Sequence, residues 1–338
     1  MKAVIIESPN RAIVSDVPYP EPGSNEVTIH VMRCGICGPD LHIFKGDYLS
    51  PYPLIPGHEF SGIVDRIGDG VKKFKLGDRV AVDPSLFCGE CELCLSGRGN
   101  HCESWGAIGD TTSGAMAEYV KVPVSNVFRL PDHMSFAEGA FIEPVACVVH
   151  GLNQLQMKVG QSVLVFGAGS MGQLLIQALA RSGSADLTVV DVDESKLTLA
   201  RSFGATRTYL SKDSASALAD RMGSGGFEVV VDATGIPSVI QSAFDYLGPK
   251  GMYLQFGVAP VEERVSVSPF NIYHMDWKIV GSMAVNHTYR PALDWMGAGR
   301  FDVQALISKS IRIEDVPGFL SGGKASNLMK VQISFEQD

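Results

Sequence analysis

Four cysteines within a short stretch constrain this chain more than any other feature. They follow the spacing C-x2-C-x2-C-x7-C, at Cys88, Cys91, Cys94 and Cys102. Thiolates at such spacings can close around one tetrahedral Zn²⁺ ion, and a closed site of this kind stabilises a loop without performing catalysis. Two disulfides are the alternative interpretation. No apolar segment follows Met1, so we expect a reducing, cytoplasmic setting, which favours a structural zinc lobe over residues 85–105.

Length and charge bound the class of protein. Domains usually hold about 100 to 200 residues, so a chain of 338 residues is expected to form two domains. The net charge of -9 offers no broad basic surface, and we expect no nucleic-acid partner. No apolar run reaches the roughly 18 to 20 residues of a membrane span, so we expect no membrane partner either.

The pattern of apolar residues changes once along the chain. In the first part, residues 1–146, short β-type runs are separated by clusters of Pro and Gly, which predicts a β-rich domain with long loops. From about residue 160, apolar strands alternate with helical stretches, which predicts a parallel sheet with crossover helices. We therefore assign residues 147–285 to a doubly wound α/β domain. The irregular tail, residues 286–338, is expected to return to the first domain.

A glycine loop follows the first strand of the second domain. The pattern G-x-G-x-x-G comes directly after SVLVF and at the start of a helix, where glycines allow a tight turn and close approach of a pyrophosphate. Asp191 ends the next strand, where its carboxylate would accept hydrogen bonds from ribose hydroxyls and repel a 2′-phosphate. We therefore expect NAD rather than NADP. The loop residues assigned to the cofactor are Gly167, Gly169, Ser170, Met171 and Gly172.

Two later strand ends are expected at the same edge of this sheet. Asp232 ends the run VVVD, and Gly257 follows the run YLQF. The carboxyl ends of strands face the ligand crevice in a doubly wound sheet, so both residues are expected to flank the ribose and the nicotinamide. Each also fits an ordinary turn at a strand end.

A second set of potential metal ligands has mixed chemistry. Cys37 offers a thiolate, His58 an imidazole, and Glu59 or Glu143 a carboxylate. Three or four such ligands suit a catalytic zinc ion that leaves one coordination position open. We expect Asp40 to accept the second ring N–H of His58 and so to fix the tautomer of that imidazole.

Two further cysteines allow other interpretations. Cys34 and Cys37 form a C-x2-C pair, which is typical of redox motifs and of zinc knuckles, although no second cysteine pair lies nearby in the first domain. Cys147 is expected to be a small buried side chain near the domain junction.

Together these motifs resemble the zinc-dependent medium-chain dehydrogenases, and specifically their polyol branch of sorbitol- and xylitol-type enzymes. The resemblance spans nearly the whole chain, and the segments come in the family's order: GICGPDLH (35–42), GHEFSGIV (57–64), the four-cysteine lobe, EPVACVVHG (143–151) and GAGSMG (167–172). It implies a GroES-like catalytic domain, a Rossmann domain, two zinc ions per chain, and a homodimer or homotetramer. It assigns the catalytic zinc to Cys37, His58 and either Glu59 or Glu143. Glutamate before proline at position 143 points to the polyol branch.

The chain departs from the family pattern at two places. Pro39 stands where the family usually has a serine or threonine that relays the substrate proton, so we expect His42 to receive that proton through water or the cofactor ribose. The segment MAVNHTY (283–289) contains no arginine, although sorbitol enzymes often have a basic and aromatic pair there. Sorbitol itself is therefore in doubt. The polar groups that we consider for the remaining hydroxyls of a polyol are Glu118, Asn286 and His287.

The resulting hypothesis is a zinc- and NAD-dependent enzyme that oxidises a secondary hydroxyl of a small-molecule polyol to the ketose. Dehydrogenation of another small alcohol, such as threonine, a vicinal diol or a polyol phosphate, is the alternative. A quinone-reductase-like or regulatory relative that keeps zinc only as structure is a more distant one, because such a protein would be expected to lose Cys37 or His58.

Overall fold

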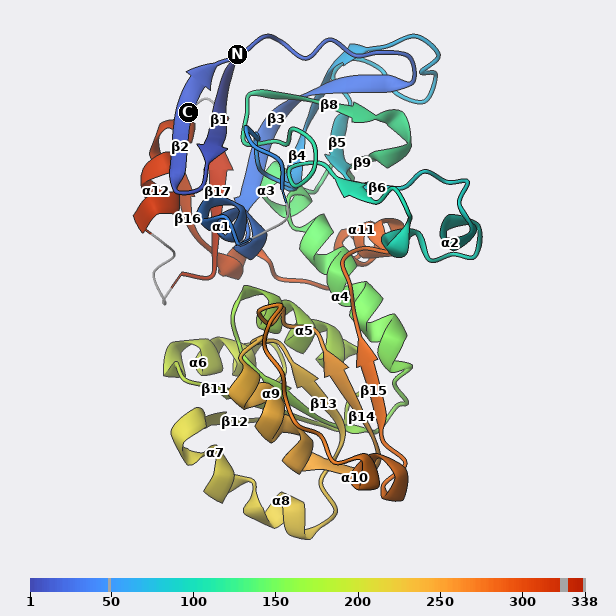
Figure 1. The fold of residues 1–338 in the computed structure, drawn as a ribbon, viewed down its shortest axis with the longest axis vertical. Helices are drawn as coiled ribbons and strands as arrows, with labels where there is room; N and C mark the ends of the chain where they lie inside the picture. Colours follow the sequence, from blue (N-terminus) through green and yellow to red (C-terminus); the bar gives the residue numbers. More distant parts are fainter. Residues whose placement is uncertain (48–49, 323–327, 337–338) are drawn as a thin grey trace. The chain divides into compact units, whose positions relative to one another are not determined.

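The computed structural model describes residues 1–47, 50–322 and 328–336, and the chain forms two compact units (Figure 1). Unit 1 contains residues 1–146 together with residues 285–338, and unit 2 contains residues 147–284. In the described part of the chain, no helix combines the length and the apolar character that a membrane crossing requires.

Unit 2 is built around a parallel sheet of six strands. The spatial order is β12-β11-β10-β13-β14-β15, and each neighbouring pair is parallel. This is the strand order of a Rossmann dinucleotide-binding fold, which confirms the predicted fold class of this half. The strands are β10 (Ser162–Phe166), β11 (Asp186–Asp191), β12 (Arg207–Leu210), β13 (Phe227–Asp232), β14 (Leu247–Gln255) and β15 (Lys278–Gly281).

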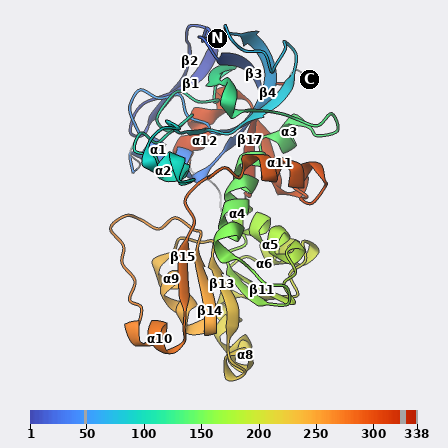
Figure 2. The same cartoon turned by 90° about the vertical axis from the view of Figure 1, so that its right-hand side faces the viewer.

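Helices cover both faces of this sheet, with α5 and α6 on one side and α9 on the other (Figure 2). All five residues of the central strand β10 are consequently buried, which explains the continuous apolar run VLVF that follows Ser162. The helices of unit 2 are α5 (Ser170–Arg181), α6 (Glu194–Ser202), α7 (Ser211–Ala217), α8 (Ala219–Gly223), α9 (Pro237–Ala243) and α10 (Pro269–His274).

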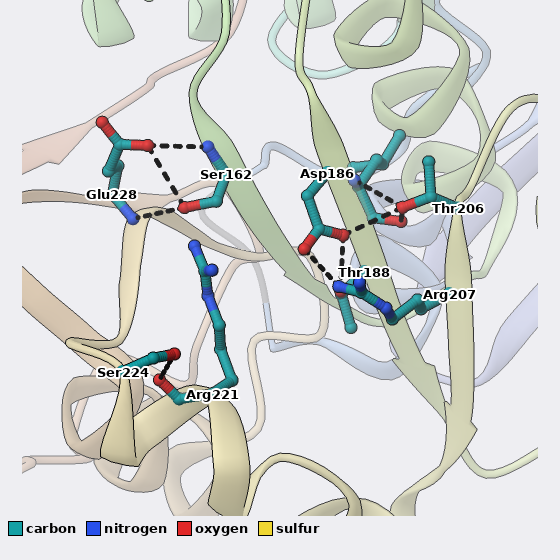
Figure 3. A network of polar contacts seen from close by, with 9 residues as sticks. Ser162, Asp186, Thr188, Thr206, Arg207, Arg221, Ser224 and Glu228 are labelled. Carbon is teal, nitrogen blue, oxygen red and sulfur yellow. Dashed lines mark hydrogen bonds and ion pairs between the residues drawn. The ribbon is translucent and has the colours of Figure 1, made fainter.

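Separate groups of polar contacts link neighbouring strands of unit 2 at their amino ends (Figure 3). At the start of β10, the backbone N–H of Ser162 donates to Glu228 Oε2 of β13 over 2.9 Å. At the start of β11, Asp186 accepts a hydrogen bond of 2.9 Å from Thr206 Oγ1 and pairs with Arg207. These contacts hold neighbouring strands together at the end of the sheet opposite the carboxyl ends, where ligands bind in a doubly wound fold.

Unit 1 is built around a seven-stranded sheet with the order β16-β17-β3-β4-β5-β9, and β8 adds a further pairing to β3. The long strand β3 is central, and its apolar residues Val27, Ile29 and Val31 are fully buried in the core. The pair β16 and β17 comes from the C-terminal segment, and β17 pairs antiparallel with β3. Residues from both ends of the chain therefore share one sheet.

The remaining elements of unit 1 surround this sheet. A hairpin of β1 and β2 and a short ladder of β6 and β7 are separate from it. The strands are β1 (Lys2–Ser8), β2 (Arg11–Asp16), β3 (Glu26–Ile36), β4 (Glu59–Ile67), β5 (Arg79–Val82), β6 (Ser85–Leu86), β7 (Gly106–Ala107), β8 (Tyr119–Pro123), β9 (Val127–Arg129), β16 (Ile307–Ile311) and β17 (Lys330–Ser334). The helices are α1 (Gly38–Lys45), α2 (Glu92–Leu95), α3 (Phe136–Gly139), α4 (Ile142–Leu155), α11 (Tyr289–Gly297) and α12 (Val316–Gly322). The residues of α4 belong partly to unit 1 and partly to unit 2.

Candidate metal centres and nucleotide-binding loop

The four-cysteine lobe brings its sulfur atoms into one cluster. All seven cysteines of the chain lie in the described residues and all are free thiols. The Sγ atoms of Cys88 and Cys94 are 3.9 Å apart, as are those of Cys91 and Cys102. A disulfide requires about 2.05 Å, whereas four sulfurs at about 2.3 Å from one zinc ion lie about 3.8 Å from one another. The separations therefore fit a tetrahedral metal site and not two disulfides.

Backbone N–H groups surround the sulfurs of this lobe. Cys91 N–H donates to Cys88 Sγ over 3.3 Å, and Ser104 N–H donates to Cys102 Sγ over 3.4 Å. The backbone N–H of Glu103 is the main cause that lowers the pKa of Cys91, whereas desolvation raises the pKa of Cys94. Such donors stabilise thiolates, which are the form that binds zinc, so the lobe is prepared for a metal ion.

A second cluster combines Cys37, His58 and Glu59. One ligand atom from each residue lies within 4.8 Å of the other two. Cys37 is the N-cap of α1, His58 directly precedes β4, and Glu59 is the first residue of that strand. Glu59 pairs with Gly35 of β3, and a Cβ at position 35 would lie 2.2 Å from Glu59 Oε2. The glycine therefore leaves the space in which the carboxylate turns toward Cys37.

Pro39 has a local structural role in this cluster. It lies in the first turn of α1, where the N–H that proline lacks would have no partner within the helix. Asp40 follows at the third position of the helix and accepts the backbone N–H of Cys37 over 2.8 Å. The start of α1 is thus fixed next to the thiol.

A buried lysine completes the charge balance of the cluster. Lys330 Nζ lies 2.7 Å from both carboxylate oxygens of Glu59, and both side chains are almost fully buried. Burial alone would raise the pKa of Glu59, but the Lys330 ammonium holds it below its ordinary value. Burial and the Glu59 carboxylate raise the pKa of the Cys37 thiol. A cation bound here would favour the thiolate, so metal binding would release a proton.

The imidazole of His58 faces two buried carboxylates. Its Nδ1 lies 3.4 Å from Asp110 Oδ1 and 3.8 Å from Asp40 Oδ1. Burial lowers the pKa of His58, but the charges of Asp110 and Asp40 outweigh it and hold that pKa well above its ordinary value. The other ring nitrogen is consequently the one available to a metal ion. The donor set of thiolate, imidazole and carboxylate fits a zinc ion of the catalytic type.

The other predicted residues of unit 1 lie in different surroundings. Glu143 is buried in the first turn of α4 and is not part of the three-residue cluster. His42 is exposed on α1, with its Nδ1 4.0 Å from Asp47. Asn286 donates to the carbonyl of Gly97 in the four-cysteine lobe over 3.0 Å. The two remaining side chains make structural contacts, Glu118 with the backbone N–H of Lys2 and His287 with the Phe87 ring.

The glycine loop of unit 2 has the geometry that a dinucleotide requires. Gly167 has φ of +95°, and a Cβ at Gly172 would lie 2.1 Å from the Gly167 carbonyl oxygen. A Cβ at Gly169 would meet no atom within 4 Å, and this residue begins α5 without a side-chain cap. The first and third glycines are therefore needed for packing, and the second leaves open space for an anion at the helix N-terminus.

Asp191 lies directly beside this loop. Its Oδ2 accepts the backbone N–H of Ala168 over 2.6 Å, and its Oδ1 accepts that of Asp193 over 2.9 Å. Each carboxylate oxygen retains a lone pair for a further donor. The loop and the acidic residue together define a dinucleotide-binding unit.

Asp232 and Gly257 are used by the protein itself at the ends of β13 and β14. The buried Asp232 carboxylate accepts hydrogen bonds from Thr234 Oγ1, the Gly235 N–H and Gln255 Nε2, at 2.6 to 3.0 Å. A Cβ at Gly257 would lie 2.2 Å from Gly235 N, which accounts for the glycine. A direct contact of either residue with the cofactor stays a prediction.

A zinc-compatible centre and a Rossmann unit in one chain define a zinc-dependent oxidoreductase that uses a nicotinamide cofactor. Comparison with known proteins agrees, since residues 23–132 match the alcohol dehydrogenase GroES-like domain and residues 170–298 match the zinc-binding dehydrogenases. D-arabinitol dehydrogenase 1 of Uromyces fabae is 32% identical over 98% of this chain and 97% of its own length. D-altritol 5-dehydrogenase of Agrobacterium fabrum is 31% identical over 99% and 100%.

A solved structure is similar over the same extent. It is described as a zinc-binding dehydrogenase from Sinorhizobium meliloti 1021 bound to NADP, and it has 33% identity, a TM-score of 0.95 and 98% coverage of both chains. The chain belongs to the zinc-dependent medium-chain dehydrogenase family, in its polyol branch. This confirms the family and the GroES-like and Rossmann folds that the sequence motifs predicted.

Proposed function

We propose that this enzyme oxidises a secondary hydroxyl of a sugar alcohol to the ketose and transfers the hydride to NAD. The observation that carries the proposal is the buried cluster of Cys37, His58 and Glu59, which occurs in one chain with the glycine loop and Asp191. The names of the relatives, which act on arabinitol and altritol, support the substrate class. A panel of sugar alcohols, vicinal diols and threonine, assayed for NADH formation, tests it. Turnover of threonine or a simple diol alone would contradict it.

Each residue of the cluster has a role in this proposal. Cys37, His58 and Glu59 would hold the zinc ion, with Glu59 preferred to Glu143 because it belongs to the cluster. Zinc in this site would act as a Lewis acid that lowers the pKa of the substrate hydroxyl. Asp40 fixes the backbone of Cys37, and Lys330 keeps Glu59 ionised. His42 would accept the proton through water, because Pro39 carries no hydroxyl.

The four-cysteine lobe would hold a second, structural zinc ion. Four sulfur ligands leave no coordination position for a substrate. The spacing of the Sγ atoms supports this assignment.

NAD is the proposed cofactor because of Asp191. Its carboxylate would accept the ribose hydroxyls and repel a 2′-phosphate. Asp191→Ala should therefore raise the KM for NAD by about tenfold, the effect of roughly 1.4 kcal/mol of lost interaction, and reduce the discrimination against NADP. The similar dehydrogenase from Sinorhizobium meliloti is bound to NADP, so relatives of this fold differ in cofactor and the preference of this enzyme has to be measured. Equal use of both cofactors by the unmodified enzyme would contradict the proposal.

We also propose that the enzyme is a homo-oligomer that associates through the edge of the Rossmann sheet. Among the described residues, β15 pairs only with β14 and is largely exposed. Ile279 on β15 and Phe270 and Tyr273 on α10 are apolar and exposed, and an unpaired apolar edge favours pairing with a second copy. Light scattering on Ile279→Lys should show a smaller assembly than the wild type, and a monomeric wild type would contradict the proposal.

A further inference from the structure

A tight turn at residues 107–112 rests on the backbone that carries His58. Gly109 has φ of +91°, and a Cβ there would lie 2.5 Å from the carbonyl carbon and oxygen of Gly57. On the far side of the turn, the Ala115 N–H donates to the Gly57 carbonyl over 2.9 Å. The turn and the residue before His58 are therefore packed directly together.

Hydrogen bonds within the turn fix the position of Asp110. The backbone N–H groups of Asp110 and Thr111 both donate to the carbonyl of Ala107, over 3.1 and 2.9 Å. Thr111 Oγ1 also accepts the Ala107 N–H over 2.9 Å. Asp110 is only 7% exposed, so its carboxylate is held inside the domain next to His58.

Two buried atoms face each other across this contact. Asp110 Oδ1 and His58 Nδ1 are 3.4 Å apart, both are inaccessible to solvent, and neither makes a hydrogen bond within the described chain. Leaving a buried donor and a buried acceptor without partners costs free energy at both atoms. A small rotation of the ring would satisfy both.

Asp40, in contrast, is less well placed to accept the Nδ1–H of His58. Its Oδ2 accepts the Cys37 N–H over 2.8 Å, its Oδ1 accepts the Gly57 N–H over 3.2 Å, and it lies farther from His58 Nδ1 than Asp110 does. Its hydrogen bonds hold the backbone on either side of the metal-binding cluster. Of the two carboxylates that face the imidazole, Asp40, which the sequence predicts to orient it, is therefore the more distant.

We propose that Asp110 is the positioning residue that accepts the Nδ1–H of His58 and thereby directs the other ring nitrogen to the catalytic zinc. This inference rests on the proposed zinc site at Cys37, His58 and Glu59. Partners of this kind fix the tautomer and orientation of a ligand histidine, and their loss typically weakens metal binding by about 10- to 100-fold.

The test is zinc release from the loaded enzyme to a coloured chelator. The release phase that is missing in Cys37→Ser identifies the catalytic zinc. Asp110→Ala should weaken the affinity for the zinc ion released in that phase by about 10- to 100-fold. Asp110→Asn should weaken that affinity less, because the amide oxygen still accepts a hydrogen bond. Asp83→Asn is the matched control, since Asp83 is a buried carboxylate of the same unit that accepts the Ser85 N–H. It should leave the phase unchanged.

The outcomes separate the inference from the proposed function. Wild-type affinity in both Asp110 variants would overturn the role of Asp110 and leave the zinc site intact. A wild-type enzyme without the Cys37-dependent phase would overturn the zinc site itself. Should Asp110→Ala fail to fold, Asp110→Asn, which keeps the size of the side chain, decides the question alone.

Discussion

The two metal-binding clusters of unit 1 are built in opposite ways. The four-cysteine lobe takes its ligands from residues 88–102, and nearby backbone N–H groups hold its sulfurs. The mixed cluster joins residues 37 and 58–59, with Asp110 beside His58 and Lys330, near the other end of the chain, paired with Glu59. A local cluster can fold around its own ion, whereas a cluster of distant segments forms only when the sheet is complete. The first is therefore suited to stabilise a loop, and the second to hold a reactive site rigidly.

The largest expected effect is on turnover. Cys37→Ser or His58→Ala should lower kcat by about 1000-fold or more, because Lewis-acid stabilisation contributes several kcal/mol and each 1.36 kcal/mol is a factor of ten. The folded fraction, measured by circular dichroism, should stay at the wild-type level. Steady-state assays at saturating polyol and NAD provide the measurement.

Cys91→Ser is the matched substitution in the other cluster. It should lower the thermal stability, because losing a metal ligand is among the changes that cost more than about 4 kcal/mol, while the protein that remains folded should keep its kcat. The assignment of a structural role to one cluster and a catalytic role to the other would be contradicted if Cys91→Ser abolished turnover in folded protein, or if Cys37→Ser kept full activity.

Lys330→Met should show how strongly the mixed cluster depends on the complete sheet. In protein without zinc in the mixed cluster, it leaves the Glu59 carboxylate buried without a counter-charge, and breaking a buried pair costs about 3 to 5 kcal/mol. Denaturant unfolding at pH 7 measures this loss. The double variant Glu59→Gln with Lys330→Met should recover part of it, because no unpaired charge remains.

The pH dependence of that loss has a definite sign. Lys330 holds the pKa of Glu59 below the ordinary 4.5, so the stabilisation is fully present above pH 4.5 and is lost as the pH falls through the lower, folded-state pKa. In Lys330→Met, burial without the counter-charge raises the pKa of Glu59 above 4.5. The difference in unfolding free energy between wild type and Lys330→Met should therefore begin to narrow above pH 4.5 and shrink further as the pH falls. A difference that stays constant with pH would exclude the ion pair as its cause.

His42→Ala has the smallest expected effect, and it tests whether His42 accepts the substrate proton near the mixed cluster. General-base catalysis usually contributes about 100- to 10,000-fold, and solvent replaces part of it at this exposed position, so we expect polyol oxidation near pH 7 to slow by roughly 10- to 1000-fold. The rate should recover at high pH, where hydroxide removes the proton. A pH-rate profile identical to that of the wild type would remove His42 from the proton path.

The sequence predicted what depends on local pattern. The Rossmann fold of unit 2 was predicted from the run SVLVF, the glycine loop and Asp191. The structure places β10 at Ser162–Phe166 and β11 at Asp186–Asp191. The short strand β12 was not predicted, because RTYL carries little apolar signal. The cysteine spacing was likewise enough to group the four sulfurs of the lobe.

The partners of the mixed cluster were missed because tertiary pairing creates them. Lys330 reaches Glu59 only because β17 pairs with β3, and a lone lysine before an apolar strand gives a weak signal. No sequence motif pointed to Asp110, because the packing of Gly109 against Gly57 is what brings Asp110 next to His58. The sequence spacing pointed to Asp40 as the partner of His58. The structure adds that both Asp40 oxygens accept backbone N–H groups and that Asp110 lies closer to His58 Nδ1.

The number of zinc ions per chain tests the two-cluster account most directly. Metal analysis of purified wild type, Cys37→Ser and Cys91→Ser, together with kcat for each, separates the clusters in one experiment. We predict about two ions in the wild type, about one in each variant, and loss of turnover only in Cys37→Ser. One ion per wild-type chain, or two ions retained in Cys37→Ser, would contradict the assignment of a catalytic zinc to Cys37, His58 and Glu59.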